Sequence, residues 1–104
     1  MANYVLVYKG GSMPASEEEQ KQVMAAWTQW YEGLGKSLVD GGNPFGPSKT
    51  VAQDGSVSDG APSALSGYTI LSAENLEAAV ALAQDCPVRQ GGASIEVYET
   101  FPVM

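Results

Sequence analysis

The sequence predicts an α+β domain with a ferredoxin-like β-α-β-β-α-β fold. Two segments have apolar residues at helical spacing, and strand-like segments stand before, between and after them. A chain with this order packs both helices on one face of a four-stranded antiparallel sheet. With 104 residues, of which 44% are hydrophobic, the chain is expected to form one folded domain with one modest core.

The first strand is predicted at residues 3–8, because NYVLVY is apolar on both faces, as is typical of a central strand. The first helix is predicted to begin after Ser16, an N-cap with which Glu19 forms a capping box. Apolar residues then recur at spacings of three and four, which predicts a single stripe that faces a core. The stripe consists of Val23, Met24, Trp27, Tyr31, Leu34 and Leu38. The helical element is therefore expected to extend through Leu38 and to end at Gly41.

The middle of the chain is predicted to be irregular. Residues 43–48 hold two prolines and a glycine in six positions, a composition typical of a turn or loop. A short strand is predicted around Thr50 and Val51, followed by a turn at Asp54-Gly55 and a second short strand at residues 56–58.

The second half of the chain contains the other strand-helix-strand unit. Residues 67–72 (GYTILS) predict a strand, after which Ser72 is expected to cap a helix over residues 73–86. Pro87 ends that helix. Residues 94–99 (SIEVYE) alternate between apolar and polar side chains and predict the last strand.

The sheet face turned away from the helices is predicted to be apolar and aromatic. On the first strand this face holds either Tyr4, Leu6 and Tyr8 or Val5 and Val7, and the third and fourth strands offer similar side chains. An exposed apolar face of this kind marks a partner interface, so the sequence predicts a homodimer.

Charge and composition exclude several functions. The net charge is -7 and the five basic residues are scattered, so nucleic-acid binding is not expected. Histidine is absent, which excludes a Ser-His-Asp triad and His-ligated zinc or haem. With one cysteine and no nucleotide-binding motif, we expect neither a cofactor nor a metal.

Location is also constrained by the sequence. It has no apolar run of the ~20 residues that span a membrane, and its first residues do not resemble a signal peptide. The single Cys86 cannot form an intrachain disulfide and is expected to be an inert, partly buried thiol. These features together favour a cytoplasmic protein that does not bind membranes.

Five segments of the sequence resemble the YCII-related proteins, a family that includes the small bacterial DGPF-domain proteins. They are YVLVYKGG, LVDGGNPFGPSKTV, DGSVSDGAP, SGYTILSAENLEAAVALAQDCPV and GGASIEVYE. The resemblance covers nearly the whole chain and implies a single YCII-related domain over residues 1–104. It also implies a dimeric α+β barrel, in which two ferredoxin-like sheets close on each other.

The sequence departs from this family where function would reside. The DGPF motif is represented by Asp59, Gly60, Ala61 and Pro62, so the aromatic residue is missing. Some YCII-related proteins carry a His on the first helix that, with an Asp, has been proposed as catalytic, and one branch is a lactone dehalogenase. This chain has no His, so the resemblance carries no such chemistry here.

The candidate pocket residues are aromatic or acidic. They are Tyr8, Trp27, Trp30, Tyr31, Asp40, Asp59 and Tyr68. Trp27, Trp30 and Tyr31 could stack on a planar ligand or could simply be core residues, and Trp30 lies beside the main stripe. We expect the pocket to lie between the sheet and the first helix.

Asp40 is the candidate for a catalytic acid, although no catalytic residue is assigned. Its alternative role is an Asx turn that shapes the bend at Gly41-Gly42. Asp59 could act as a general base beside Ser63 and Ser66, or it could form a turn with Gly60 that leads into the next strand.

Three functions are compatible with these residues. The first is a dimeric module that binds a small apolar or aromatic ligand, or an accessory module without chemistry of its own. The second is a cofactor-free lyase, isomerase or oxygenase that uses only Asp40, Tyr8 or Tyr68. The third is a regulatory partner of another protein, because DGPF-type proteins are sometimes encoded beside sigma factors. The absence of histidine favours the first function over the second.

Overall fold

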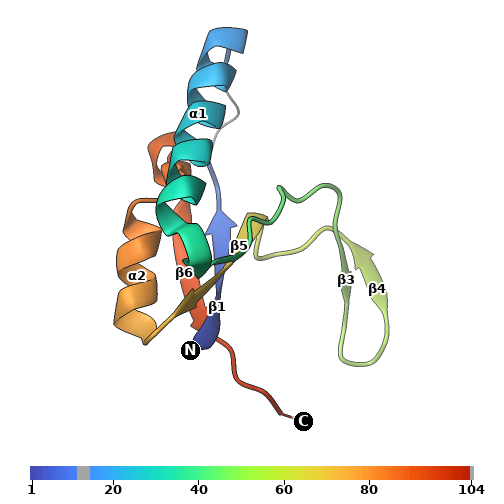
Figure 1. Cartoon of the computed structure of the whole chain (residues 1–104). Coiled ribbons are helices and arrows are strands. Elements are labelled where there is room, and N and C mark those ends of the chain that lie inside the picture. The colour runs from blue at the N-terminus through green and yellow to red at the C-terminus, as the bar shows by residue number, and fades with distance from the viewer. Residues whose placement is uncertain (12–14, 104) are drawn as a thin grey trace.

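The computed structural model, which describes residues 1–11 and 15–103, has the predicted ferredoxin-like architecture (Figure 1). The sheet has the strand order β2-β5-β1-β6, and every neighbouring pair is antiparallel. Its strands are β1 (Ala2–Lys9), β2 (Leu38–Asp40), β5 (Leu65–Ala73) and β6 (Ser94–Glu99). Both α-helices, α1 (Glu17–Leu34) and α2 (Leu76–Gln84), lie on one side of this sheet.

The core lies between the sheet and the helices. Side chains of β1 and β5 that point toward the helices are buried, and they include Tyr4, Leu6, Tyr8, Thr69 and Leu71. The alternate positions of the same strands are only partly buried, and they form the opposite face of the sheet. We call this opposite face the outer face. It carries Val5, Val7, Tyr68, Ile70 and Tyr98, with the acidic residues Asp40 and Glu96 beside them.

The first helix is shorter than predicted. The hydroxyl of Ser16 accepts a hydrogen bond from the backbone N–H of Glu19, as expected for the N-cap. The carboxylate of Glu19 instead accepts from the N–H of Ala15, one residue before the expected donor. The helix ends at Leu34, because Gly35 adopts a φ of +53°, a backbone conformation that favours glycine. A short 3₁₀ helix, η1 (Gly35–Ser37), follows it.

The second strand of the sheet is also not where the sequence predicted it. Leu38 belongs to β2, at the edge of the sheet, and not to the first helix. The short strands expected near residues 50–51 and 56–58 do form, as β3 (Lys49–Val51) and β4 (Val57–Asp59). These two strands pair only with each other, in a two-stranded ribbon outside the main sheet.

The second helix begins three residues later than predicted. Ser72 lies within β5, which extends to Ala73, and the side chain of Asn75 caps α2 by accepting a hydrogen bond from the N–H of Ala78. A 3₁₀ helix, η2 (Pro87–Gly91), follows α2 and begins at the proline that was expected to end the helix.

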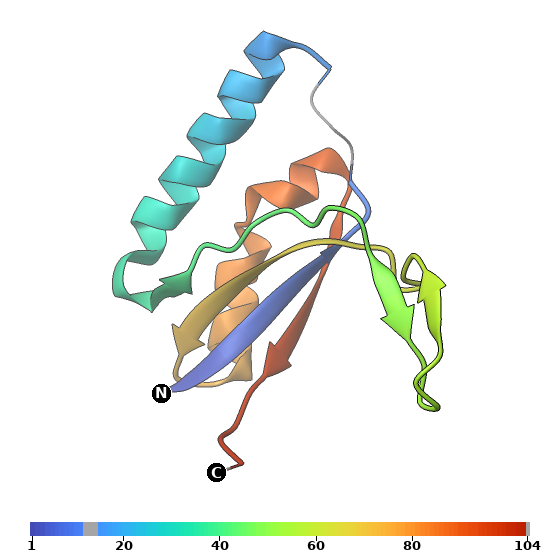
Figure 2. The ribbon, with the colours of Figure 1, turned by 90° about the vertical axis from the view of Figure 1, so that its right-hand side faces the viewer.

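The first helix leans away from the sheet, so that its N-terminal half lies beyond the strands (Figure 2). Val23 and Met24, predicted to face the core, are therefore exposed. Trp30, which lies beside the predicted stripe, is instead 7% exposed. Contact with the core is made by the C-terminal half of α1, through large aromatic side chains.

Candidate functional site

The aromatic residues of α1 gather over the sheet. Trp27, Trp30 and Tyr31 lie three and four positions apart, so the helix brings them to one side. The ring of Trp27 lies 5.8 Å from that of Tyr8 on β1, 5.6 Å from Trp30 and 5.7 Å from Tyr31. These centroid distances and tilted planes are typical of favourable aromatic packing. Four of the predicted pocket residues therefore do come together, as one packed cluster.

A chain of hydroxyl groups lies beneath this cluster. The thiol of Cys86 donates to the hydroxyl of Tyr8 over 3.7 Å, and Tyr8 donates to the Oγ1 of Thr69. Thr69 in turn donates to the carbonyl of Gly41 at 3.0 Å, as does the hydroxyl of Tyr31 at 3.1 Å. The chain links α1, β1, β5 and the end of α2 through side chains that satisfy one another.

Burial keeps the tyrosine hydroxyls and the thiol of this chain protonated. Desolvation raises the pKa of Tyr8 far above its usual value, and the neighbouring Cys86 raises it further. Desolvation also raises the pKa of the Cys86 thiol and of the Tyr31 hydroxyl. Tyr8 and Cys86 are therefore neutral hydrogen-bonding groups near pH 7 and not a phenolate or a thiolate. Cys86 is buried, and not partly buried as predicted.

Asp40 and Tyr68 lie on the outer face, away from the aromatic cluster. Asp40 Oδ1 accepts a hydrogen bond from the N–H of Gly42 at 2.9 Å, so the predicted Asx turn is present. The hydroxyl of Tyr68 lies 3.4 Å from Asp40 Oδ2, and the ring of Phe45 stacks on that of Tyr68. Asp40 and Phe45 are exposed and Tyr68 is partly buried. The sequence patterns did not predict that Phe45 lies beside the other two.

The turn after Asp40 depends on glycine at position 42. Gly42 has a φ of +75°, and a Cβ atom there would lie 1.7 Å from the carbonyl oxygen of Tyr68. Because that oxygen belongs to the backbone of β5, a side chain at this position would force the two segments apart.

Asp59 lies apart from every other candidate. It ends β4, and its carboxylate forms an ion pair with Lys49 at 2.9 Å on the exposed ribbon. Gly60 follows with a φ of +81°, so the chain turns there, as the structural interpretation of this motif predicted.

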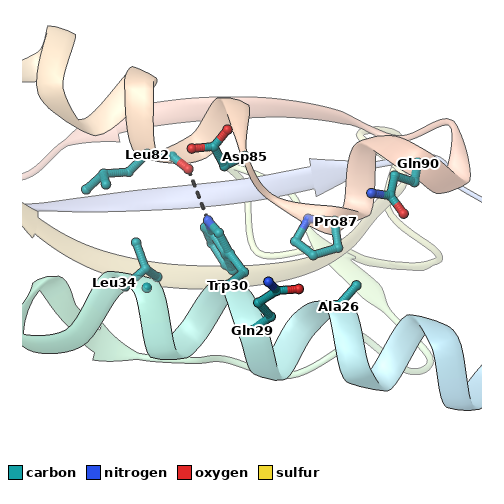
Figure 3. Close-up of a pocket in the computed structure, with 9 residues that line it drawn as sticks. Ala26, Gln29, Trp30, Leu34, Leu82, Asp85, Pro87 and Gln90 are labelled. Atoms are coloured by element: carbon teal, nitrogen blue, oxygen red, sulfur yellow. Dashed lines mark hydrogen bonds between the residues drawn. The ribbon is translucent and has the colours of Figure 1, made fainter.

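A cleft of about 440 Å³ lies between α1 and the segment formed by the end of α2 and η2 (Figure 3). Buried Trp30, Leu34 and Pro87 form its floor, while exposed Gln29, Gln90 and Asp85 stand around it. The indole N–H of Trp30 donates a hydrogen bond to the carbonyl of Leu82 at 3.1 Å. This bond fixes the ring between the helices.

The structure places this cleft between the two helices, whereas the predicted pocket lay between the sheet and α1. Among the predicted candidates, Trp30 lines the cleft. Its polar residues Gln29, Asp85 and Gln90 were not predicted, because they come from two distant segments and have no local pattern. The lining of the cleft combines apolar side chains with a few polar ones.

Neither a metal site nor a membrane span is found in the part of the chain that the structure describes. No three Cys, Asp or Glu side chains there gather closely enough to hold a metal ion. None of the helices described has the length and apolar character needed to cross a bilayer.

Comparisons with known proteins identify the fold. The profile of the YCII-related domain matches residues 3–103. A solved structure of 5-chloro-2-hydroxyhydroquinone dehydrochlorinase (TftG) from Burkholderia phenoliruptrix, in complex with 2,5-dihydroxybenzoquinone, superimposes with a TM-score of 0.55 at 18% sequence identity. The match covers 94% of this chain and 93% of the dehydrochlorinase chain, and at this identity it shows a shared fold. No protein with a curated description matches the chain.

Proposed function

The chain belongs to the YCII-related domain family, and from this premise we propose that it is a homodimeric module that binds a small, uncharged aromatic ligand. The observation that carries the ligand proposal is the cleft between α1 and α2. Its apolar floor suits a flat ring, and its rim offers the amides of Gln29 and Gln90 as donors and acceptors. The carboxylate of Asp85 accepts hydrogen bonds from hydroxyl groups and disfavours an anion.

The ligand of one structural neighbour supports a flat, ring-shaped ligand. TftG was solved with a hydroxylated quinone, a flat ring with polar substituents at its edge. Such a molecule has the shape and hydrogen-bonding groups that the cleft would match. The net charge of -7 on this chain favours an uncharged member of the class.

Hydroquinone tests the site, because it is uncharged, aromatic and carries two hydroxyl groups. We expect its titration to shift backbone amide resonances around Trp30, Leu82 and Gln90 in a saturable manner. The Gln29→Ala/Gln90→Ala double variant should bind hydroquinone about tenfold more weakly, because each amide contributes one net hydrogen bond. Benzoate, an anion of similar size, should bind more weakly than hydroquinone to the unmodified protein.

A matched control is the Gln22→Ala/Gln53→Ala double variant, which changes two exposed glutamines that do not line the cleft. It should bind hydroquinone as the unmodified protein does. Resonance shifts confined to Trp27, Tyr31 or Asp40, or the absence of saturable binding, would contradict the proposed site.

An enzymatic function is the second candidate, and the contact between Asp40 and Tyr68 is the observation that favours it. A carboxylate beside a phenol can move a proton to or from a bound substrate. Tyr8 is less suited to this role, because its hydroxyl is buried and already bonded to Thr69. Turnover of a hydroxylated aromatic compound that is lost in Tyr68→Phe would support this second function.

A further inference from the structure

One face of the β3–β4 ribbon carries an exposed apolar pair, Val51 and Val57, beside the exposed ion pair of Lys49 and Asp59. Val51 and Val57 stand opposite each other in the antiparallel register, so their side chains share one face of the ribbon. They are 69% and 61% exposed. Together the two valines form a small exposed apolar patch, which burial against another surface would stabilise.

The ribbon holds its shape through its own polar contacts. Lys49 and Asp59 form an ion pair at one end, and the hydroxyl of Thr50 donates to the carbonyl of Gly60 at 2.6 Å. At the other end, Asp54 Oδ1 accepts from the N–H of Ser56. Two-stranded ribbons are nevertheless marginally stable in water without a third layer. The apolar pair and the isolation of the ribbon both indicate that something packs against it.

The whole chain exposes more surface than a compact monomer of its size. Its accessible surface is 7442 Å², whereas a compact monomer of 10.9 kDa is expected to expose about 5,600 Å². Its radius of gyration is 15.2 Å, compared with about 13 Å for a compact domain of this length. The excess of about 1,900 Å² falls within the area that each partner buries in obligate dimers, about 1,000–2,500 Å².

The ribbon projects from the sheet on the side opposite the helices (Figure 1). A body that packs on the outer face therefore lies on the same side of the molecule as the ribbon. A second copy of this chain is such a body, because two-fold symmetry pairs identical patches and brings the ribbon of each copy toward the other.

We infer that the β3–β4 ribbon is an arm that packs its Val51–Val57 face against a second copy of this chain when two outer faces meet. The inference rests on the proposed homodimer and adds to it a part of the interface outside the main sheet. The arm would supply the third layer that the ribbon lacks within one chain.

The Val51→Lys/Val57→Glu double variant tests the arm. The new side chains face each other across the ribbon and can form an ion pair, so the ribbon keeps its pairing while charges replace the apolar pair. We expect the dissociation constant of the dimer, measured by sedimentation, to rise about a hundredfold, because four valines leave the interface.

Two further variants make the result specific. The Gln53→Lys/Ser58→Glu variant adds the same charges to the turn and to the other side of the ribbon, and should dimerise normally. The Val5→Lys variant charges the outer face and should be monomeric. If Val5→Lys is monomeric but Val51→Lys/Val57→Glu dimerises normally, the arm is overturned and the proposed dimer stands.

Other outcomes address the dimer itself. A Val5→Lys variant that still dimerises would contradict the outer face as the interface. If the unmodified protein is monomeric, both the dimer and the arm are overturned. The exposed valines of the ribbon would then point to a partner of another sequence. Hydrogen exchange of the unmodified protein needs no variant: amides of residues 49–59 should exchange more slowly above the dissociation constant than below it, and equal rates would overturn the arm.

Discussion

At the scale of single residues, Asp40 was a candidate catalytic acid in the sequence, whereas in the structure its carboxylate stabilises a backbone turn. Oδ1 closes the turn by accepting from the N–H of Gly42, and Oδ2 lies near the hydroxyl of Tyr68. Both oxygens have donors, and the side chain is exposed. The turn places the carbonyl of Gly41 where the hydroxyls of Tyr31 and Thr69 reach it.

We therefore expect Asp40→Asn to change the free energy of unfolding by less than ~1 kcal/mol, because Asn keeps an acceptor for the Gly42 N–H. Hydroquinone affinity should not change, since Asp40 does not line the cleft. Thermal unfolding and the same titration measure both quantities. A more stable variant that has lost binding would identify Asp40 as a strained functional acid.

The buried hydroxyl chain predicts how stability depends on pH. Folding raises the pKa of Tyr8 and of Cys86, mainly through desolvation, so the unfolded chain loses these protons at lower pH than the folded one. The stability that these two buried groups contribute is fully present below the pKa values of the unfolded chain, near 8.5 for Cys and 10 for Tyr. It is lost progressively as the pH rises above those values.

Chemical unfolding followed between about pH 7 and pH 10.5 should show this loss. In Cys86→Ala the decline in stability should begin at higher pH than in the unmodified protein, because the thiol no longer titrates in the unfolded chain. An unchanged onset in Cys86→Ala would show that the buried thiol does not contribute.

At the scale of elements, the sequence patterns predicted which segments form helices and strands better than where those elements begin and end. Ser16 was identified as an N-cap because its signal is local, whereas the end of α1 was missed because the conformation of Gly35 has no unique residue signature. Leu38, the first residue of β2, continues the apolar spacing of the helix, so periodicity alone could not separate β2 from it. Only pairing with β5 makes them a strand.

Part of the candidate site could be predicted from the sequence, namely the aromatic cluster and not the rim of the cleft. The cluster of Trp27, Trp30, Tyr31 and Tyr8 follows from helical spacing and from the position of β1 under α1. Trp30 is more buried than Trp27 because its ring also packs between α1 and α2, a contact that the pattern of one helix cannot contain. The rim of the cleft depends on the same contact, so Asp85 and Gln90 could not be identified from the sequence.

At the scale of the whole molecule, net charge and apolar surface have opposite effects on dimerisation. Each copy carries a net charge of -7, so two copies repel one another. The outer face nevertheless presents Val5, Val7 and Ile70 between partly exposed aromatic side chains, and its burial favours association. A dimer through this face must be held by apolar contact that exceeds the repulsion.

This balance predicts that salt strengthens the dimer. Raising the NaCl concentration from about 0.02 M to about 0.3 M shortens the Debye length severalfold and screens the repulsion between copies, while apolar contact is retained. We expect the dissociation constant from sedimentation velocity to fall over this range. Val23→Lys, which adds one positive charge on the exposed surface of α1, should show a smaller salt effect with the interface intact. Dimerisation that weakens with salt would instead mean that ion pairs hold the copies together, and the apolar outer face would then not be the main contact.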